Sequence, residues 1–245
     1  MQQVLCFGDS NTWGYNPENG ERFPWGIRWT SILQQKLANK DIRIIEEGLC
    51  GRTTVFEDPL RQGRKGVSLF PTLLETHKPE NIVIMLGTND CKTAFSASPD
   101  VIGKGIRRLL IQAKQYSADS RILLVSPIHL GEQVWKDEFD PEFSPESVEV
   151  SRKLTDVYRN IADEFGVEFL AASSVVDSSE ADQEHMNPEG HAALAGAIRQ
   201  NTQRVCRTAY HRLLQNEGEY KNDRRHDLRS HPSAHPSNKI GRAHV

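Results

Sequence analysis

The chain repeats one pattern five times: a short apolar run and, after it, a longer amphipathic segment. Each run has four or five residues and is rich in β-branched side chains. Continuously apolar runs of this length are typical of strands buried on both faces of a sheet. The predicted strands are Val4–Phe7, Ile42–Ile45, Ile82–Leu86, Ile122–Val125 and Val167–Leu170.

The segments between the runs carry apolar residues at helical spacing, as Ile102, Ile106 and Leu109 do. A last helix is expected to begin near Pro188, because proline suits the first helical turn, and to run to about Leu214. Strand–helix alternation predicts an α/β fold, a three-layer α/β/α sandwich around a five-stranded parallel sheet. The other predicted helices are Trp29–Leu37, Val67–His77, Val101–Tyr116 and Val148–Phe165.

A single domain accounts for residues 1–216 of the 245-residue chain. The polar run 217–245 shows no periodicity and is predicted to be a disordered tail. Its last residues, Lys239–Val245, can be encoded by a DNA string that resembles a sequencing-adapter oligonucleotide. We therefore expect the extreme C-terminus to be an assembly artefact.

Composition and charge exclude several classes of partner. A net charge of −3 gives no basis for binding nucleic acid or an anionic membrane surface. No apolar stretch has the length of a membrane span, and Met1–Gln3 lead directly into the first strand, which leaves no room for a signal peptide. We expect a cytoplasmic protein with reduced cysteines. Their spacing matches no zinc site, and neither a metal nor another cofactor is expected.

Reactive residue types follow four of the predicted strands. Parallel sheets gather such residues beyond the carboxyl ends of their strands, at one edge. GDS (residues 8–10) follows the first strand, GLCGR (48–52) the second, and GTND (87–90) the third. SSEADQEHMNPEGH (178–191) follows the fifth. Ser, Gly, Asn, Asp and His therefore meet at one edge, and this set is sufficient for acyl transfer.

Each residue type has a role in that chemistry. A serine hydroxyl such as Ser10 is a weak nucleophile and needs an adjacent base, which His185 can be. Asp182 can hold the imidazole in the right tautomer and stabilise its charged form. The oxyanion needs preorganised donors, and the backbone N–H groups of Ser10 and Gly51 and the side chain of Asn89 can provide three.

Simpler roles exist for some of these residues. Taken alone, Ser10 could cap a helix, Asn89 could be a turn residue, and Asp90 could cap a helix. The four blocks in register favour the catalytic interpretation.

Other residues compete for the histidine and aspartate roles. His129 follows the fourth strand and can line the pocket, whereas His191 lies inside the predicted last helix, where packing is favoured. Asp177 and Glu180 are alternatives to Asp182, and the three-residue spacing to the histidine decides for Asp182.

The blocks GDSN, GLCGRTT, GTND and DQEHMNPEGH resemble those of the GDSL, or SGNH, hydrolase family over roughly residues 4–214. CFGDSNTWGY and NIVIMLGTND are similar to its arylesterase and perhydrolase branch in particular. The resemblance implies a flavodoxin-like strand order and the same triad and oxyanion-hole residues. It also implies cleavage of small acyl esters, often acetyl, acyl transfer to alcohols or peroxide in some members, and assembly into octamers.

Two positions depart from the family pattern. Gln183 stands where the family often has glycine after the triad aspartate, which changes the turn but removes no chemistry. Asn11 follows Ser10 where some relatives have an apolar residue, and it is predicted to contact the substrate. Trp13 and Tyr15 belong either to the core or to the lining of the acyl or alcohol pocket.

A long excursion, Leu130–Ser147, follows the fourth strand. It could be a lid, a subunit contact or a bare loop. Its apolar Val134, Trp135, Phe139 and Phe143 among many acids favour a contact surface. Together with the family resemblance, this predicts a homo-oligomer.

The leading hypothesis is a metal-independent serine esterase that cleaves short-chain acyl esters through an acyl-enzyme. The alternative is an acyltransferase or perhydrolase with the same triad, and a more remote one is an inactive binding protein on this scaffold. The chain has no Gly-x-Ser-x-Gly elbow, which excludes an ordinary α/β-hydrolase. It has no Gly-x-Gly-x-x-Gly after the first strand, which excludes a dinucleotide site.

Overall fold

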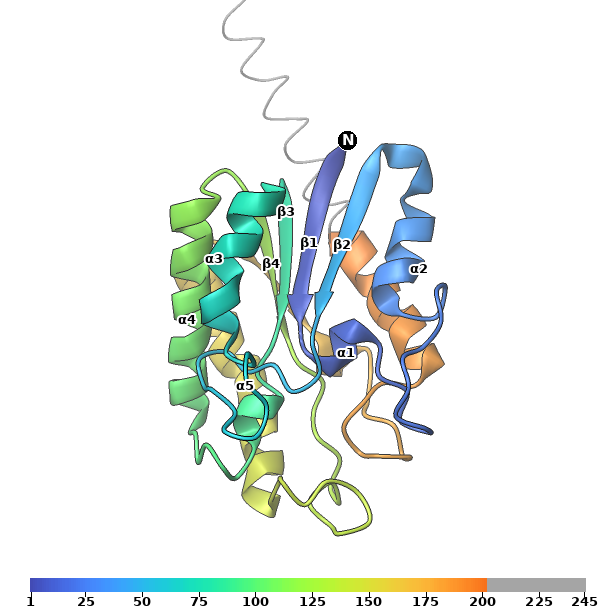
Figure 1. The fold of residues 1–245 in the computed structure, drawn as a ribbon, viewed down its shortest axis with the longest axis vertical. Coiled ribbons are helices and arrows are strands. Elements are labelled where there is room, and N and C mark those ends of the chain that lie inside the picture. The colour runs from blue at the N-terminus through green and yellow to red at the C-terminus, as the bar shows by residue number, and fades with distance from the viewer. Residues whose placement is uncertain (202–245) are drawn as a thin grey trace, which may run out of the picture. The chain divides into compact units, whose positions relative to one another are not determined.

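A five-stranded sheet lies at the centre of residues 1–201, the part of the chain that the computed structural model describes. The strand order is β2-β1-β3-β4-β5, and all neighbouring strands are parallel (Figure 1). This is the flavodoxin-like order, so the predicted α/β fold is confirmed. The strands are β1 (Gln2–Gly8), β2 (Ile42–Gly48), β3 (Asn81–Met85), β4 (Arg121–Ser126) and β5 (Glu168–Ala171).

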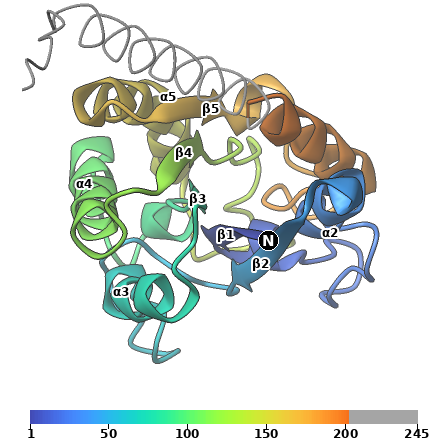
Figure 2. The same ribbon diagram turned by 90° about the horizontal axis from the view of Figure 1, so that it is seen from above.

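Helices cover both faces of the sheet (Figure 2). One face packs against α3, α4 and α5, and the other against α2 and a helical segment over residues 188–201. The long helices are α2 (Trp29–Lys36), α3 (Gly66–His77), α4 (Pro99–Tyr116) and α5 (Pro145–Phe165), and the short ones are α1 (Ser10–Trp13), η1 (Ala38–Lys40), η2 (Asn89–Cys91) and η3 (Ala172–Ser174).

The central strand shows why two cores form. Side chains alternate along β1, so Leu5 and Phe7 enter the core under α3, α4 and α5, while Val4 and Cys6 enter the core under α2. All four are almost fully buried. A strand that is apolar on both faces has to lie between two helical layers, as the sequence predicts.

The excursion between β4 and α5 differs from its prediction. Val134 and Phe143 are buried in the main core rather than displayed on a contact surface, while Trp135 remains exposed. Helix α5 begins at Pro145 because Ser144 forms a capping box with Ser147. Apolar residues among acids therefore mark an extension of the core here.

Several predictions lie outside the described residues. They are the domain end at residue 216, the end of the last helix near Leu214, and the tail from residue 217 with its suspected artefact. Within residues 1–201, no helix is long and apolar enough to cross a membrane.

Candidate active site

Ser10 lies where the central strand meets the first helical turn. β1 ends at Gly8, Asp9 caps α1 by accepting a hydrogen bond from the backbone N–H of Asn11, and Ser10 opens α1. Gly8 is needed because a Cβ there would lie 2.1 Å from the Thr12 Oγ1 atom. Ser10 is thus held at the carboxyl edge of the sheet, the lower edge in Figure 1.

The three predicted triad residues are in contact. The Nε2 atom of His185 lies 2.8 Å from the Oγ atom of Ser10, and its Nδ1 atom lies 2.6 Å from an oxygen of Asp182. The other Asp182 oxygen accepts hydrogen bonds from the backbone N–H groups of Glu184 and His185. The carboxylate therefore fixes both the loop and the ring, and the serine hydroxyl faces a base that can take its proton.

Electrostatics prepare this imidazole to hold a proton. Burial lowers the pKa of His185, but the carboxylates of Glu184 and Asp182 outweigh it and raise the pKa above its ordinary 6.5. Burial alone would raise the pKa of Asp182, yet its hydrogen bond to His185 and the charge of that ring bring it below the usual value. Asp182 is thus ionised whenever the ring needs a partner.

The predicted oxyanion donors come from neighbouring strand ends. Arg52 donates from Nη1 to the carbonyl of Gly8, which ties the loop after β2 to the end of β1. Asn89 donates one side-chain N–H to the carbonyl of Arg52 at 3.2 Å, which leaves its second N–H. Gly51 has a positive φ of 80°. Within the described chain, the backbone N–H groups of Ser10 and Gly51 have no acceptor.

Asp90 holds the two oxyanion loops together, a role that differs from the helix cap considered above. Its carboxylate is fully buried and accepts hydrogen bonds from the backbone N–H and the hydroxyl of Thr54. Burial raises the pKa of Asp90 to about 6. The residue after Asn89 therefore anchors the loop that carries Gly51.

Asn11 does not face the substrate as predicted. Its side chain is 3% exposed, its Oδ1 atom accepts from the backbone N–H of Met186 at 3.0 Å, and its Nδ2 atom donates to the carbonyl of Glu184 at 3.4 Å. The amide thus holds the residues on both sides of His185. A side chain adjacent to the nucleophile positions the base.

The two early aromatic residues take different places. Tyr15 lies against His185, with ring centroids 4.1 Å apart, so it forms part of the site's wall. Trp13 instead contacts Arg22, whose guanidinium lies 5.4 Å from the indole and whose Nε donates to the Trp13 carbonyl.

The alternative histidines and acids lie apart from Ser10. His129 pairs with Thr155 of α5 at 3.3 Å, and this contact directs it toward the helix rather than the triad. His191 is fully buried, accepts from the backbone N–H of Trp29, and has its pKa lowered to about 4, chiefly by burial. It is a packing residue, as its place in a helix predicts.

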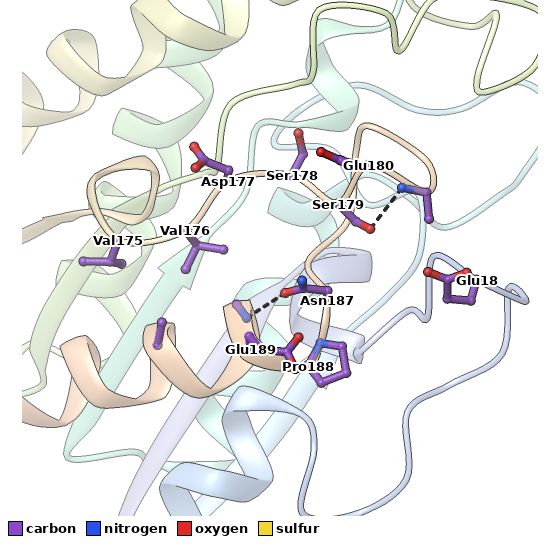
Figure 3. Close-up of a pocket in the computed structure, with 13 residues that line it drawn as sticks. Glu18, Val175, Val176, Asp177, Ser178, Ser179, Glu180, Asn187, Pro188 and Glu189 are labelled. Carbon is purple, nitrogen blue, oxygen red and sulfur yellow. Dashed lines mark hydrogen bonds between the residues drawn. The ribbon is translucent and has the colours of Figure 1, made fainter.

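A surface pocket lies beside the triad loop without including the triad. It has a volume of about 670 Å³ and is lined by residues 175–181 and 187–190 together with Glu18 and Ala193. The competing acids Asp177 and Glu180 belong to this pocket (Figure 3). They are therefore separate from the side chains that contact His185.

Two features of the triad loop are informative. Gln183 adopts a left-handed backbone with φ of 62°, the conformation that the family's glycine favours, so the turn is kept despite the substitution. Its carbonyl also accepts a hydrogen bond from Gly131, which ties the loop to the excursion. Glu184 was not predicted to belong to the site, yet its carboxylate lies 3.8 Å from the Nε2 atom of His185.

A serine in contact with a histidine–aspartate pair, at the carboxyl edge of a flavodoxin-like sheet, places the protein in the class of serine hydrolases. Within that class, the chain belongs to the GDSL-like lipase/acylhydrolase family, whose model matches residues 6–193. The resemblance drawn from the four sequence blocks is thereby confirmed.

Solved structures and curated proteins agree with this family. A carbohydrate acetylesterase family member from Sinorhizobium meliloti is 34% identical with a TM-score of 0.76, covering 83% of this chain and 98% of that one. The aryl esterase of M. smegmatis is 33% identical with a TM-score of 0.75, covering 83% and 99%. An arylesterase of Vibrio mimicus is 28% identical over 120 residues, 48% of this chain and 52% of that protein. The chain spans about half the length of the curated relatives it matches.

Proposed function

We propose that this protein is a serine esterase that cleaves short-chain acyl esters through a covalent acyl-enzyme. The observation that carries the proposal is the continuous contact from Ser10 Oγ through the His185 ring to the Asp182 carboxylate. Such a chain is what turns a serine hydroxyl into a nucleophile.

The reaction follows from the placement of these atoms. Nε2 of His185 takes the proton as Ser10 Oγ attacks the ester carbonyl, and Asp182 stabilises the imidazolium. The imidazolium then gives its proton to the departing alcohol oxygen. Water, deprotonated by the same ring, releases the acid from Ser10.

The backbone N–H groups of Ser10 and Gly51 and the second N–H of Asn89 are proposed to bind the oxyanion. Preorganised donors of this kind typically contribute about 10²–10³ in rate each. Support comes from the ties among Gly8, Arg52 and Asn89, which hold the three donors at one edge of the sheet.

A small acyl group, such as acetyl, is the proposed preference. Ser10 is 3% exposed and Tyr15 packs on the catalytic ring, so space near the nucleophile is limited. The printed names of two structural neighbours, an acetylesterase and an aryl esterase, are consistent with small esters. Glu184, a charged neighbour of His185, favours water over an apolar alcohol as the acceptor, and hence hydrolysis over acyl transfer.

The test uses p-nitrophenyl esters of increasing chain length. We expect kcat/KM to fall from acetyl and butyryl to decanoyl, and Ser10→Ala to lower the rate by several orders of magnitude while the unfolding temperature stays near that of the wild type. A covalent serine inhibitor should label the peptide that contains Ser10. Retention of a tenth of the activity by Ser10→Ala would reject the assignment.

A further inference from the structure

Glu184 is a buried carboxylate without a hydrogen-bond partner in the described chain. The residue is 6% exposed, and its contact with a polar group is the 3.8 Å approach to Nε2 of His185, which is too long for a hydrogen bond. Burial raises the pKa of Glu184. An unpaired carboxylate in such a place costs free energy of folding, so its presence needs a reason.

The loop does not supply that reason, because it uses only the backbone of Glu184. The backbone N–H donates to Asp182, and the carbonyl accepts from Asn11. Both bonds would form with almost any residue at this position. The side chain is therefore free to serve something other than the fold of the loop.

The charges around Glu184 do not neutralise it. Lys92 is the base that acts on it, but the Lys92 ammonium is hydrogen-bonded to Glu142 and lies 3.5 Å from Asp140. Asp140 and Asp182 add negative charge on the same side. The surroundings of Glu184 thus suit a hydrogen-bond donor or a cation and disfavour an anion.

The place of Glu184 points to one part of the substrate. In the proposed reaction, Nε2 of His185 delivers a proton to the leaving alcohol oxygen, which must then lie within about 3 Å of that atom. A carboxylate 3.8 Å from Nε2 is therefore a neighbour of the alcohol part of the ester.

We propose that Glu184 is a specificity residue that accepts a hydrogen bond from a donor on the alcohol part, one or two carbons from the ester oxygen. The donor is a hydroxyl or a protonated amine, and both offer the same N–H or O–H chemistry. This inference rests on the proposed esterase function and adds the class of alcohol to it.

Two esters of nearly equal size provide the test: 2-hydroxyethyl acetate, which carries the donor, and n-propyl acetate, which lacks it. The ratio of their kcat/KM values is measured at pH 9 for the wild type, Glu184→Gln and Glu184→Leu. Because a hydrogen bond to a charged acceptor is lost, the ratio should fall roughly tenfold to a hundredfold in Glu184→Leu and less in Glu184→Gln. The dimethylaminoethyl ester, measured at pH 7.5, distinguishes an amine donor from a hydroxyl.

Glu180→Leu is the matched control, because Glu180 belongs to the same loop but is exposed. Its ratio should equal that of the wild type. An unchanged ratio in Glu184→Leu, or an equal loss on both esters, would overturn the inference, since a merely structural role affects both. Glu184→Gln keeps the shape of the side chain and carries the test if Glu184→Leu does not fold. A wild type that cleaves neither these esters nor p-nitrophenyl acetate would instead reject the esterase function.

Discussion

Replacing Asn11 by leucine, a residue of similar shape, should weaken both stability and catalysis. The change leaves the backbone N–H of Met186 and the carbonyl of Glu184 without partners, and both residues are buried. An unsatisfied buried group costs about 1–3 kcal/mol, and one of the two bonds is long, so we expect a loss of about 2–4 kcal/mol. For a chain of this size, that corresponds to a fall in Tm of roughly 5–15 °C.

The catalytic effect should appear in kcat. The two lost bonds flank His185, and a displacement of the base by about 1 Å can cost on the order of 10²-fold in rate. Thermal unfolding by circular dichroism and steady-state hydrolysis of p-nitrophenyl acetate measure the two effects on the same samples. Asn19→Leu is the control, because the Asn19 side chain accepts one exposed hydrogen bond. Wild-type Tm and kcat in Asn11→Leu would refute the claim that this amide holds the loop.

Two further predictions concern pH and assembly. His185 must be neutral to take the proton of Ser10, and its pKa is raised, so kcat/KM should rise with pH through a value above 6.5. Glu184→Gln removes a carboxylate that favours the charged ring and should move this limb to lower pH; Asp182, Asp9 and Tyr15, which also face the ring, stay in place. A limb that moves upward or not at all would contradict the assigned electrostatics. We also expect a homo-oligomer larger than a dimer, supported by exposed Trp25, Leu60 and Trp135, and a monomer mass in light scattering at micromolar concentration would refute it.

The sequence predicts the sheet and the triad because their signals are local. Continuously apolar runs indicate buried strands, and a parallel sheet brings their carboxyl ends to one edge, so Ser10 and Asn89 must lie near each other in space. The three-residue spacing of Asp182 and His185 likewise lets one short loop carry both. These inferences need periodicity and topology, which a single sequence contains.

The missed residues depend on contacts between distant parts of the chain. Asn11 is polar and follows the nucleophile, which suggests the substrate, but its partner Met186 lies 175 residues away. His129 follows a strand like the other site residues, yet Thr155 on a neighbouring helix takes its ring. Glu184 carries no local signal, because a charged residue in a loop is ordinarily solvated. Only the packing of the loop against the sheet buries it.

The chain order of the site has a consequence for protein synthesis. Ser10 lies in the second element of the chain, and its base follows 175 residues later. At about 5–20 residues per second, a ribosome needs roughly 9–35 s to make the segment between them. Throughout that time, the nascent chain has a nucleophile without its base. Ester cleavage therefore begins only when the loop that holds His185 has left the ribosome, and turnover on stalled chains of graded length would report the moment at which this loop docks on β1.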